Sequence, residues 1–148
     1  MDWASRKRLG LQRAASAWLI RKHIDPDARF HFVEEDRLLE VAALLGAKTF
    51  HGRGVGDFPM LPTRSTFAVL MDKHDLWGKD PALDLMGRLL DKWPPGVVPD
   101  PEVLGLRALT KGFVDSIPDD HEKLRVVIPM YEAFYRWCGK RLEGVQLI

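Results

Sequence analysis

The stretch "RFHFVEEDRLLEVAALLGAKTFHG", residues 29–52, decides the fold because it contains a strand, a helix and a second strand in succession. Apolar and polar residues alternate from Arg29, which puts Phe30 and Phe32 on one face of a strand. Residues 36–46 have helical periodicity, with Gly46 as the C-terminal stop. Residues 47–52 form the second candidate strand. A strand, a helix and a strand in so few residues predict a small parallel βαβ unit.

Helices are predicted on both sides of this unit. Residues 15–24 read as a short helix that ends at Asp25-Pro26, because the residue before a proline is driven out of the helical region. Asp-Pro pairs mark the starts of two later helices, with Asp as N-cap and Pro at the first helical position. The helices expected after the βαβ unit cover 67–77, 80–93, 100–117 and the segment from Asp119 onward. The fold prediction is therefore mostly α (α+β), one helical domain with a small two-stranded βαβ-like element.

Length and charge set the limits for the class of protein. The chain has 148 residues, 46% of them hydrophobic, which suits a single domain over residues 1–148. Its net charge of +1 argues against a general polyanion binder. The first 24 residues nevertheless hold six basic residues and one acidic residue. Residues 1–13 are thus predicted to be a basic N-terminal arm, with a solvated arm favoured over one that attracts an anion, a nucleic acid or an acidic partner.

Two features of the sequence bear on the cellular compartment of the protein. Cys138 is the sole cysteine, so no intrachain disulfide can form, which fits a reducing compartment. Residues 9–20, "LGLQRAASAWLI", have some features of a signal peptide, but Gln12 and Arg13 interrupt the apolar run of about 7–15 residues that such a signal needs. No run approaches the ~20 apolar residues that span a bilayer. The expectation is a cytoplasmic protein without a membrane partner.

Each segment that could be catalytic or bind a ligand also has an ordinary structural explanation. The segment "PDDHE", residues 118–122, places two carboxylates beside a histidine, which suits a metal or a general base, but the same residues also cap a helix. Arg21 lies four residues before Asp25 and can form an ion pair with it or bind an oxyanion. Cys138 falls in an apolar helical stripe and is expected to be a buried, inert thiol.

Four segments together resemble the C-terminal domain of chromate-resistance proteins of the ChrB type. These segments, in order, are "AWLIRKHIDPDARFHFV" (17–33), "DPALD" (80–84), "PDDHEKL" (118–124) and "YEAFYRWC" (131–138). The resemblance spans most of the chain, and its first and last segments are specific in combination. It implies a role in chromate-induced regulation or resistance, in some members with a metal-dependent activity, so a divalent metal is the implied cofactor.

The chain departs from the family pattern at several positions. Ser16-Ala17 replaces a Cys-Pro pair, Gln12 an aspartate, Ser65 a cysteine and Ala68 an aspartate, and residues 52–73 contain no histidine. A thiol is a soft metal ligand and a redox centre, whereas serine is neither. The sequence thus keeps the family's frame with altered chemistry.

The residues that match the family pattern imply a pocket for an oxyanion or small ligand. Asp25, Asp120 and His121 would provide polarity or proton transfer. Trp18, Arg21, Tyr131 and Tyr135 would bind the ligand, with Arg21 holding the anion.

Two other classes of function remain open. One is a metal-dependent or acid/base enzyme that acts on a small molecule through Asp25, Asp120 and His121. The other is a noncatalytic module whose basic arm engages nucleic acid or a partner protein, although no helix-turn-helix is recognisable.

Overall fold

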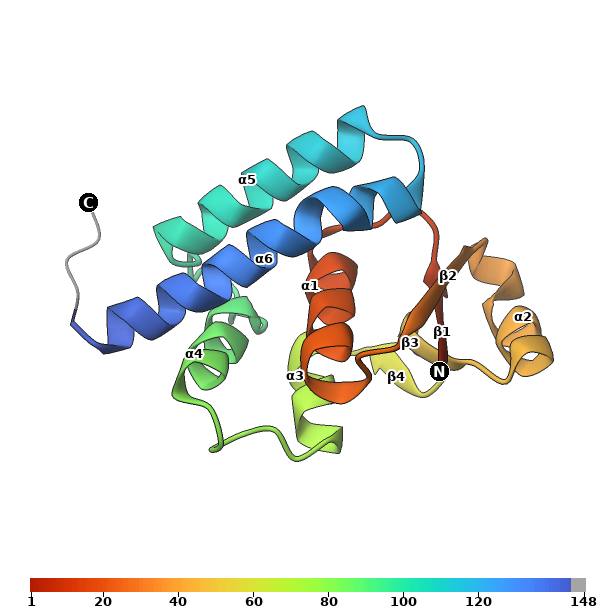
Figure 1. Ribbon diagram of the computed structural model, residues 1–148, viewed down its shortest axis with the longest axis horizontal. Helices are drawn as coiled ribbons and strands as arrows, with labels where there is room; N and C mark the ends of the chain where they lie inside the picture. Colours follow the sequence, from red (N-terminus) through yellow and green to blue (C-terminus); the bar gives the residue numbers. More distant parts are fainter. Residues whose placement is uncertain (145–148) are drawn as a thin grey trace.

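The computed structural model describes residues 1–144 as a parallel β-sheet beside a larger group of helices (Figure 1). The strands are β1 (Asp2–Arg6), β2 (Arg29–Val33), β3 (Lys48–Arg53) and β4 (Phe58–Met60). Their order in the sheet is β2-β1-β3-β4, and all neighbours run parallel. The helices are α1 (Leu11–Leu19), α2 (Leu38–Leu45), α3 (Thr66–Lys73), α4 (Pro81–Leu90), α5 (Pro101–Ser116) and α6 (Asp120–Leu142). A π-helical turn, Ile20–Ile24, extends α1, and a 3-10 turn, Glu35–Arg37, precedes α2.

The predicted two-stranded element is wrong, because β1 lies between the two strands that the sequence indicated. Residues 2–6 fall within the predicted basic arm, yet Trp3, Ala4 and Ser5 are buried. Burial on both faces removes the alternation that identifies a strand in the sequence. The Ser5 hydroxyl donates a 2.6 Å hydrogen bond to the Phe50 carbonyl, which ties β1 to β3. The first half of the arm is therefore a central strand of the sheet.

Each face of the sheet has its own hydrophobic core. Trp3, Phe30 and Phe50 belong to the large core that includes residues of α1, α3, α4, α5 and α6. Ala4, on the opposite face of β1, packs with Leu38 and Ala42 of α2. Figure 1 accordingly shows α2 on one side of the strands and the other helices on the opposite side.

Several helix ends follow the sequence signals. Asp80 accepts hydrogen bonds from the amides of Ala82 and Leu83, with Pro81 at the first helical position. Gly46 ends α2 with φ 63°, a left-handed conformation that favours glycine. Ser65, one residue before the predicted Thr66, caps α3. The helix α6 continues through Pro129, where the sequence predicted a kink or break.

The direction in which the chain crosses the sheet reverses beside β1. The connection through α1 leads from β1 to β2, whereas the connection through α2 returns past β1 to β3. In open parallel sheets, ligands bind outside the carboxyl ends of the strands where the connections diverge in this way. This topology therefore predicts a ligand site at the junction between β1 and β3.

Candidate functional site: a basic cleft at the sheet switch point

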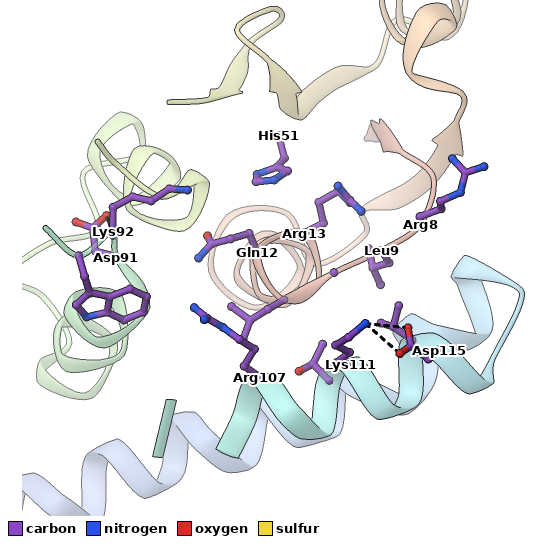
Figure 2. Close-up of a pocket in the computed structure, with 15 residues that line it drawn as sticks. Arg8, Leu9, Gln12, Arg13, His51, Asp91, Lys92, Arg107, Lys111 and Asp115 are labelled. Carbon is purple, nitrogen blue, oxygen red and sulfur yellow. Dashed lines mark hydrogen bonds and ion pairs between the residues drawn. The ribbon is translucent and has the colours of Figure 1, made fainter. Parts of the chain in front are cut away.

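A cavity of about 590 Å³ lies at the carboxyl ends of β1 and β3. Figure 2 shows its side chains around α1, with His51 of β3 on one side and Arg107 and Lys111 of α5 on the other. The β1–α1 loop, the start of α1 and the segment after α4 supply the remaining lining residues. We call this cavity the switch-point cleft; it is lined by residues 8–13, His51, residues 91–93, Arg107, Thr110, Lys111, Val114 and Asp115.

Positive charge predominates in the switch-point cleft. Both of its acidic side chains are already engaged, Asp91 by Arg64 at 2.9 Å and Asp115 by Lys111 at 3.0 Å. By contrast, among residues 1–144, Arg13, Lys92 and Arg107 form no ion pair. A concave surface with unpaired charges of one sign concentrates ligands of the opposite sign.

Arg13 is the most unusual of these basic residues. Only 9% of its surface is exposed, and its Nε donates no hydrogen bond to any described residue. Burial, together with the nearby charges of Arg6 and Arg53, lowers the pKa of Arg13 to about 10, and the charges of Asp120 and Glu35, which form no ion pair with it, offset part of this lowering. A buried cation without a partner is costly, so such a group marks a place where an anion would be stabilised.

The N-terminus of α1 supplies hydrogen-bond donors to the same cleft. Its N-cap, Gly10, provides no side-chain cap, and a Cβ built there would meet nothing within 4 Å. No described residue accepts a hydrogen bond from the amides of Leu11 or Gln12. Free amides in the first turn and the positive end of the helix dipole both favour an anion.

His51 contributes a neutral ring. Its side chain is buried, and its Nδ1 lies 2.6 Å from the hydroxyl of Thr66. Burial and the charges of Arg13 and Arg6 lower the pKa of His51 to about 3. His51 is thus uncharged near neutral pH and adds hydrogen-bonding capacity rather than charge.

A second cavity, of about 700 Å³, lies on the other side of Arg13, which lines both. Its cations face carboxylates: Arg53 Nε lies 2.8 Å from Glu35, and Lys7 lies 3.5 Å from Glu34. The charges in this second cavity are therefore largely compensated, whereas those of the switch-point cleft are not.

Comparison of the sequence with known proteins identifies its family. A sequence model described as "ChrB, C-terminal domain" matches residues 3–138. The chain belongs to the ChrB C-terminal domain family. It is 32% identical over 134 residues to Protein ChrB of Cupriavidus metallidurans. That alignment covers 90% of this chain and 40% of the relative, so the chain spans well under half of the relative's length. No solved structure matches.

The seven site residues predicted from the sequence line neither the switch-point cleft nor the second cavity described above. Asp25 accepts a 3.0 Å hydrogen bond from the Trp3 indole and lies 3.2 Å from the terminal amine. Arg21 is exposed, with its guanidinium 4.9 Å above the centre of the Phe30 ring. The roles assigned to Asp25 and Arg21 stay predictions.

Two further predicted residues lie near the start of α6. His121 is exposed, and its ring lies edge-on to Phe32 at 5.3 Å between centroids. Asp120 accepts hydrogen bonds from the amides of Arg8 and Leu9 and lies 3.2 Å from the Lys123 ammonium. Asp119 caps α6 by accepting a hydrogen bond from the Glu122 amide. These carboxylates therefore have structural partners, and the chemical roles proposed for Asp120 and His121 stay untested.

The structure does bring Trp18 and Tyr135 together. Their rings lie 5.3 Å apart, the Trp18 indole donates to Glu132 at 3.1 Å, and the Tyr135 hydroxyl donates to Asp80. Tyr131 is buried, and its hydroxyl lies 2.7 Å from that of Thr110, which lines the switch-point cleft. Tyr131 and Asp120 are thus the predicted residues in direct contact with residues that line the cleft.

Within residues 1–144, no group of three His, Cys, Asp or Glu side chains could hold a metal ion, and no helix is long and apolar enough to cross a membrane.

Burial raises the pKa of Cys138 to about 12, which agrees with the expected inert thiol. Ser65 and Ser16, which stand where the family resemblance implies cysteines, are both buried.

Proposed function

We propose that this ChrB-family domain binds an oxyanion in the switch-point cleft and, through that binding, serves in chromate resistance. The observation that carries the proposal is the buried Arg13 side chain, whose Nε–H has no acceptor among the described residues, at the uncapped N-terminus of α1. A tetrahedral oxyanion accepts several hydrogen bonds at once, from a guanidinium and from backbone amides. The role in chromate resistance comes from the family resemblance.

The surroundings of Arg13 support the proposal. Lys92 and Arg107 add unpaired positive charge, which raises the local concentration of anions and their association rate. The acidic side chains of the cleft are held by other cations, so they compete weakly for the anion's partners.

Arg21, the anion ligand expected from the sequence, has weaker support. Its side chain is exposed, where a single guanidinium–anion contact is weak in water. It also already contacts Phe30 and the Ala28 carbonyl. Arg13 is therefore the better candidate.

Titration calorimetry with chromate, sulfate and phosphate tests the proposal. Arg13→Gln should weaken binding by about tenfold or more, because hydrogen bonds to charged groups contribute roughly 1.5–3 kcal/mol. Arg21→Gln is the matched control and should bind as the wild type does. Loss of binding in Arg21→Gln with retention in Arg13→Gln would move the site to the segment predicted from the sequence. Absence of anion binding by the wild type would refute the proposal.

A further inference from the structure

The switch-point cleft is much larger than an inorganic oxyanion. A four-oxygen anion fills about 120 Å³ if each oxygen takes the roughly 30 Å³ of a water molecule. The cleft holds about 590 Å³, a volume typical of sites for organic ligands. An anion at the α1 N-terminus would leave most of the cleft unfilled, so the cleft has room for a ligand that extends beyond its charged group.

Gln12 indicates what the rest of that ligand contains. Its Nε2 donates to the Leu90 carbonyl at 3.0 Å, which fixes the orientation of the amide. Its Oε1 is then a buried acceptor without a donor among the described residues. A fully ionised oxyanion has no hydrogen to give, whereas a ligand with hydroxyl or N–H groups can satisfy this oxygen once a movement of the Gln12 side chain exposes it to the cleft.

A planar pair of side chains also lines the cleft. The Arg107 guanidinium lies 5.8 Å from the centre of the Trp93 ring, and Trp93 is half-buried. Arg107 is exposed, so the face of its guanidinium that is turned away from Trp93 remains available to another planar group. Aromatic rings and guanidinium planes are the surfaces on which heterocyclic bases stack.

From these features we propose that the switch-point cleft binds a nucleoside monophosphate. This inference rests on the anion site proposed above. The phosphate lies at Arg13 and the first-turn amides of α1, the sugar hydroxyls or base N–H groups donate to Gln12 Oε1, and the base stacks on the Trp93–Arg107 pair. Location at the switch point of a parallel sheet agrees with this ligand class, because mononucleotides occupy that position in other open parallel sheets.

Calorimetry on the whole chain, with AMP, GMP, CMP, UMP, ribose 5-phosphate, adenosine and inorganic phosphate as probes, tests the inference. At least one nucleotide should bind tenfold or more tightly than inorganic phosphate, ribose 5-phosphate and adenosine. Trp93→Leu should lower nucleotide affinity about tenfold and leave the affinity for phosphate unchanged. Arg13→Gln should lower both affinities.

Trp137→Leu is the matched control variant. Trp137 is also half-buried and lies beneath an arginine, Arg141, at 5.3 Å, but it lines neither cavity. This variant should bind nucleotides as the wild type does. Equal losses in Trp93→Leu and Trp137→Leu would overturn the stacking role.

The other outcomes separate this inference from the proposed function. Phosphate binding that depends on Arg13, with no gain for any nucleotide, overturns the nucleotide inference and preserves the oxyanion site. Adenosine binding as tightly as AMP also overturns the inference, because the phosphate would then have no role. Absence of binding by every anion overturns both proposals.

Discussion

The carboxylate of Asp120 accepts a 3.0 Å hydrogen bond from the backbone amide of Leu9. The same carboxylate accepts a second bond from the Arg8 amide and lies 3.2 Å from Lys123. Asp120 thereby joins the first turn of α6 to the loop between β1 and α1, which forms one border of the switch-point cleft. These contacts give it a positioning role for the loop that leads into Gly10.

Asp120→Asn should destabilise the protein at neutral pH. The asparagine keeps the shape but loses the negative charge that accepts two amide bonds and pairs with buried Lys123. We expect the free energy of unfolding in urea to fall by about 1.5–3 kcal/mol, the usual range for hydrogen bonds to a charged group. Asp75→Asn, at an exposed residue, is the control and should change this free energy by less than about 0.5 kcal/mol.

The same variant should alter the response to acid. Burial acts to raise the pKa of Asp120, but the amide bonds from Leu9 and Arg8 and the charge of Lys123 outweigh it and lower the pKa. A lowered pKa in the folded state gives stability that is present above the unfolded-state pKa, about 4, and is lost as pH falls below it. Between pH 5 and pH 3 the wild type should therefore lose more stability than Asp120→Asn; an equal loss would contradict the assignment.

Arg13→Met should stabilise the ligand-free protein while it removes anion binding. The arginine is buried without a partner, and its pKa, lowered to about 10, shows that the folded state disfavours its charge. Replacement by an apolar side chain removes that cost, so the free energy of unfolding should rise by about 1 kcal/mol or more. Thermal and urea unfolding without added anion, together with calorimetry, measure both effects. A destabilised variant would mean that Arg13 has a structural role.

The local elements of this fold were readable from the sequence, whereas two strands were not. Apolar and polar residues alternate in β2, and clear turn residues follow β3. The Asp80-Pro81 pair marks the start of α4. β1 is five residues long, is buried on both faces and is followed at once by Lys7 and Arg8, so it resembles a charged arm. β4 has three residues, too few for a periodic pattern to appear.

The cleft was missed for a different physical reason. Arg13, His51, Lys92 and Arg107 come from four separate segments, and each one alone resembles an ordinary residue of its kind. In the sequence, Gln12 and Arg13 interrupt an apolar run, Gln12 stands where the family pattern has an aspartate, and Arg13 belongs to a basic segment, but none of these features marks a site residue. What distinguishes Arg13 is burial without a partner, which depends on the packing of distant elements. The one local signal of this end of the sheet is the helix start at Gly10, which has no side-chain cap.

His51→Asn should reduce the acid sensitivity of the protein. Burial and neighbouring cations lower the pKa of His51 to about 3, below its unfolded value of about 6.5. The free energy of unfolding is therefore fully retained above pH ~6.5. It decreases as pH falls toward the folded-state pKa, because the unfolded chain takes up a proton at His51 that the folded protein does not. Between pH 6.5 and 5, the wild type should lose about 1–2 kcal/mol more than the variant in urea unfolding. Asparagine is the suitable replacement because residue 51 has φ 60°, which asparagine tolerates.

A bound anion provides an independent check on His51. Part of the lowering of its pKa comes from Arg13, Arg6 and Lys92, so an anion that offsets these charges should raise the pKa. Saturating phosphate should therefore shift the His51 titration upward in NMR, and it should not do so in Arg13→Gln. The same shift in both proteins would indicate a general salt effect rather than binding at Arg13.

Tyr135→Phe distinguishes a structural role from the ligand-binding role that the sequence resemblance assigned to this residue. The Tyr135 hydroxyl donates to Asp80, whose other oxygen caps α4 through the Ala82 amide. Loss of the hydroxyl should lower the free energy of unfolding by about 1.5 kcal/mol, the lower end of the range for hydrogen bonds to a charged group, because the Asp80 carboxylate keeps its bond to the helix amide. Calorimetry should give an unchanged affinity for phosphate, since Tyr135 lines neither cavity. A several-fold weaker affinity in a normally folded Tyr135→Phe protein would instead place the ligand beside Trp18 and Tyr135, as the sequence predicted.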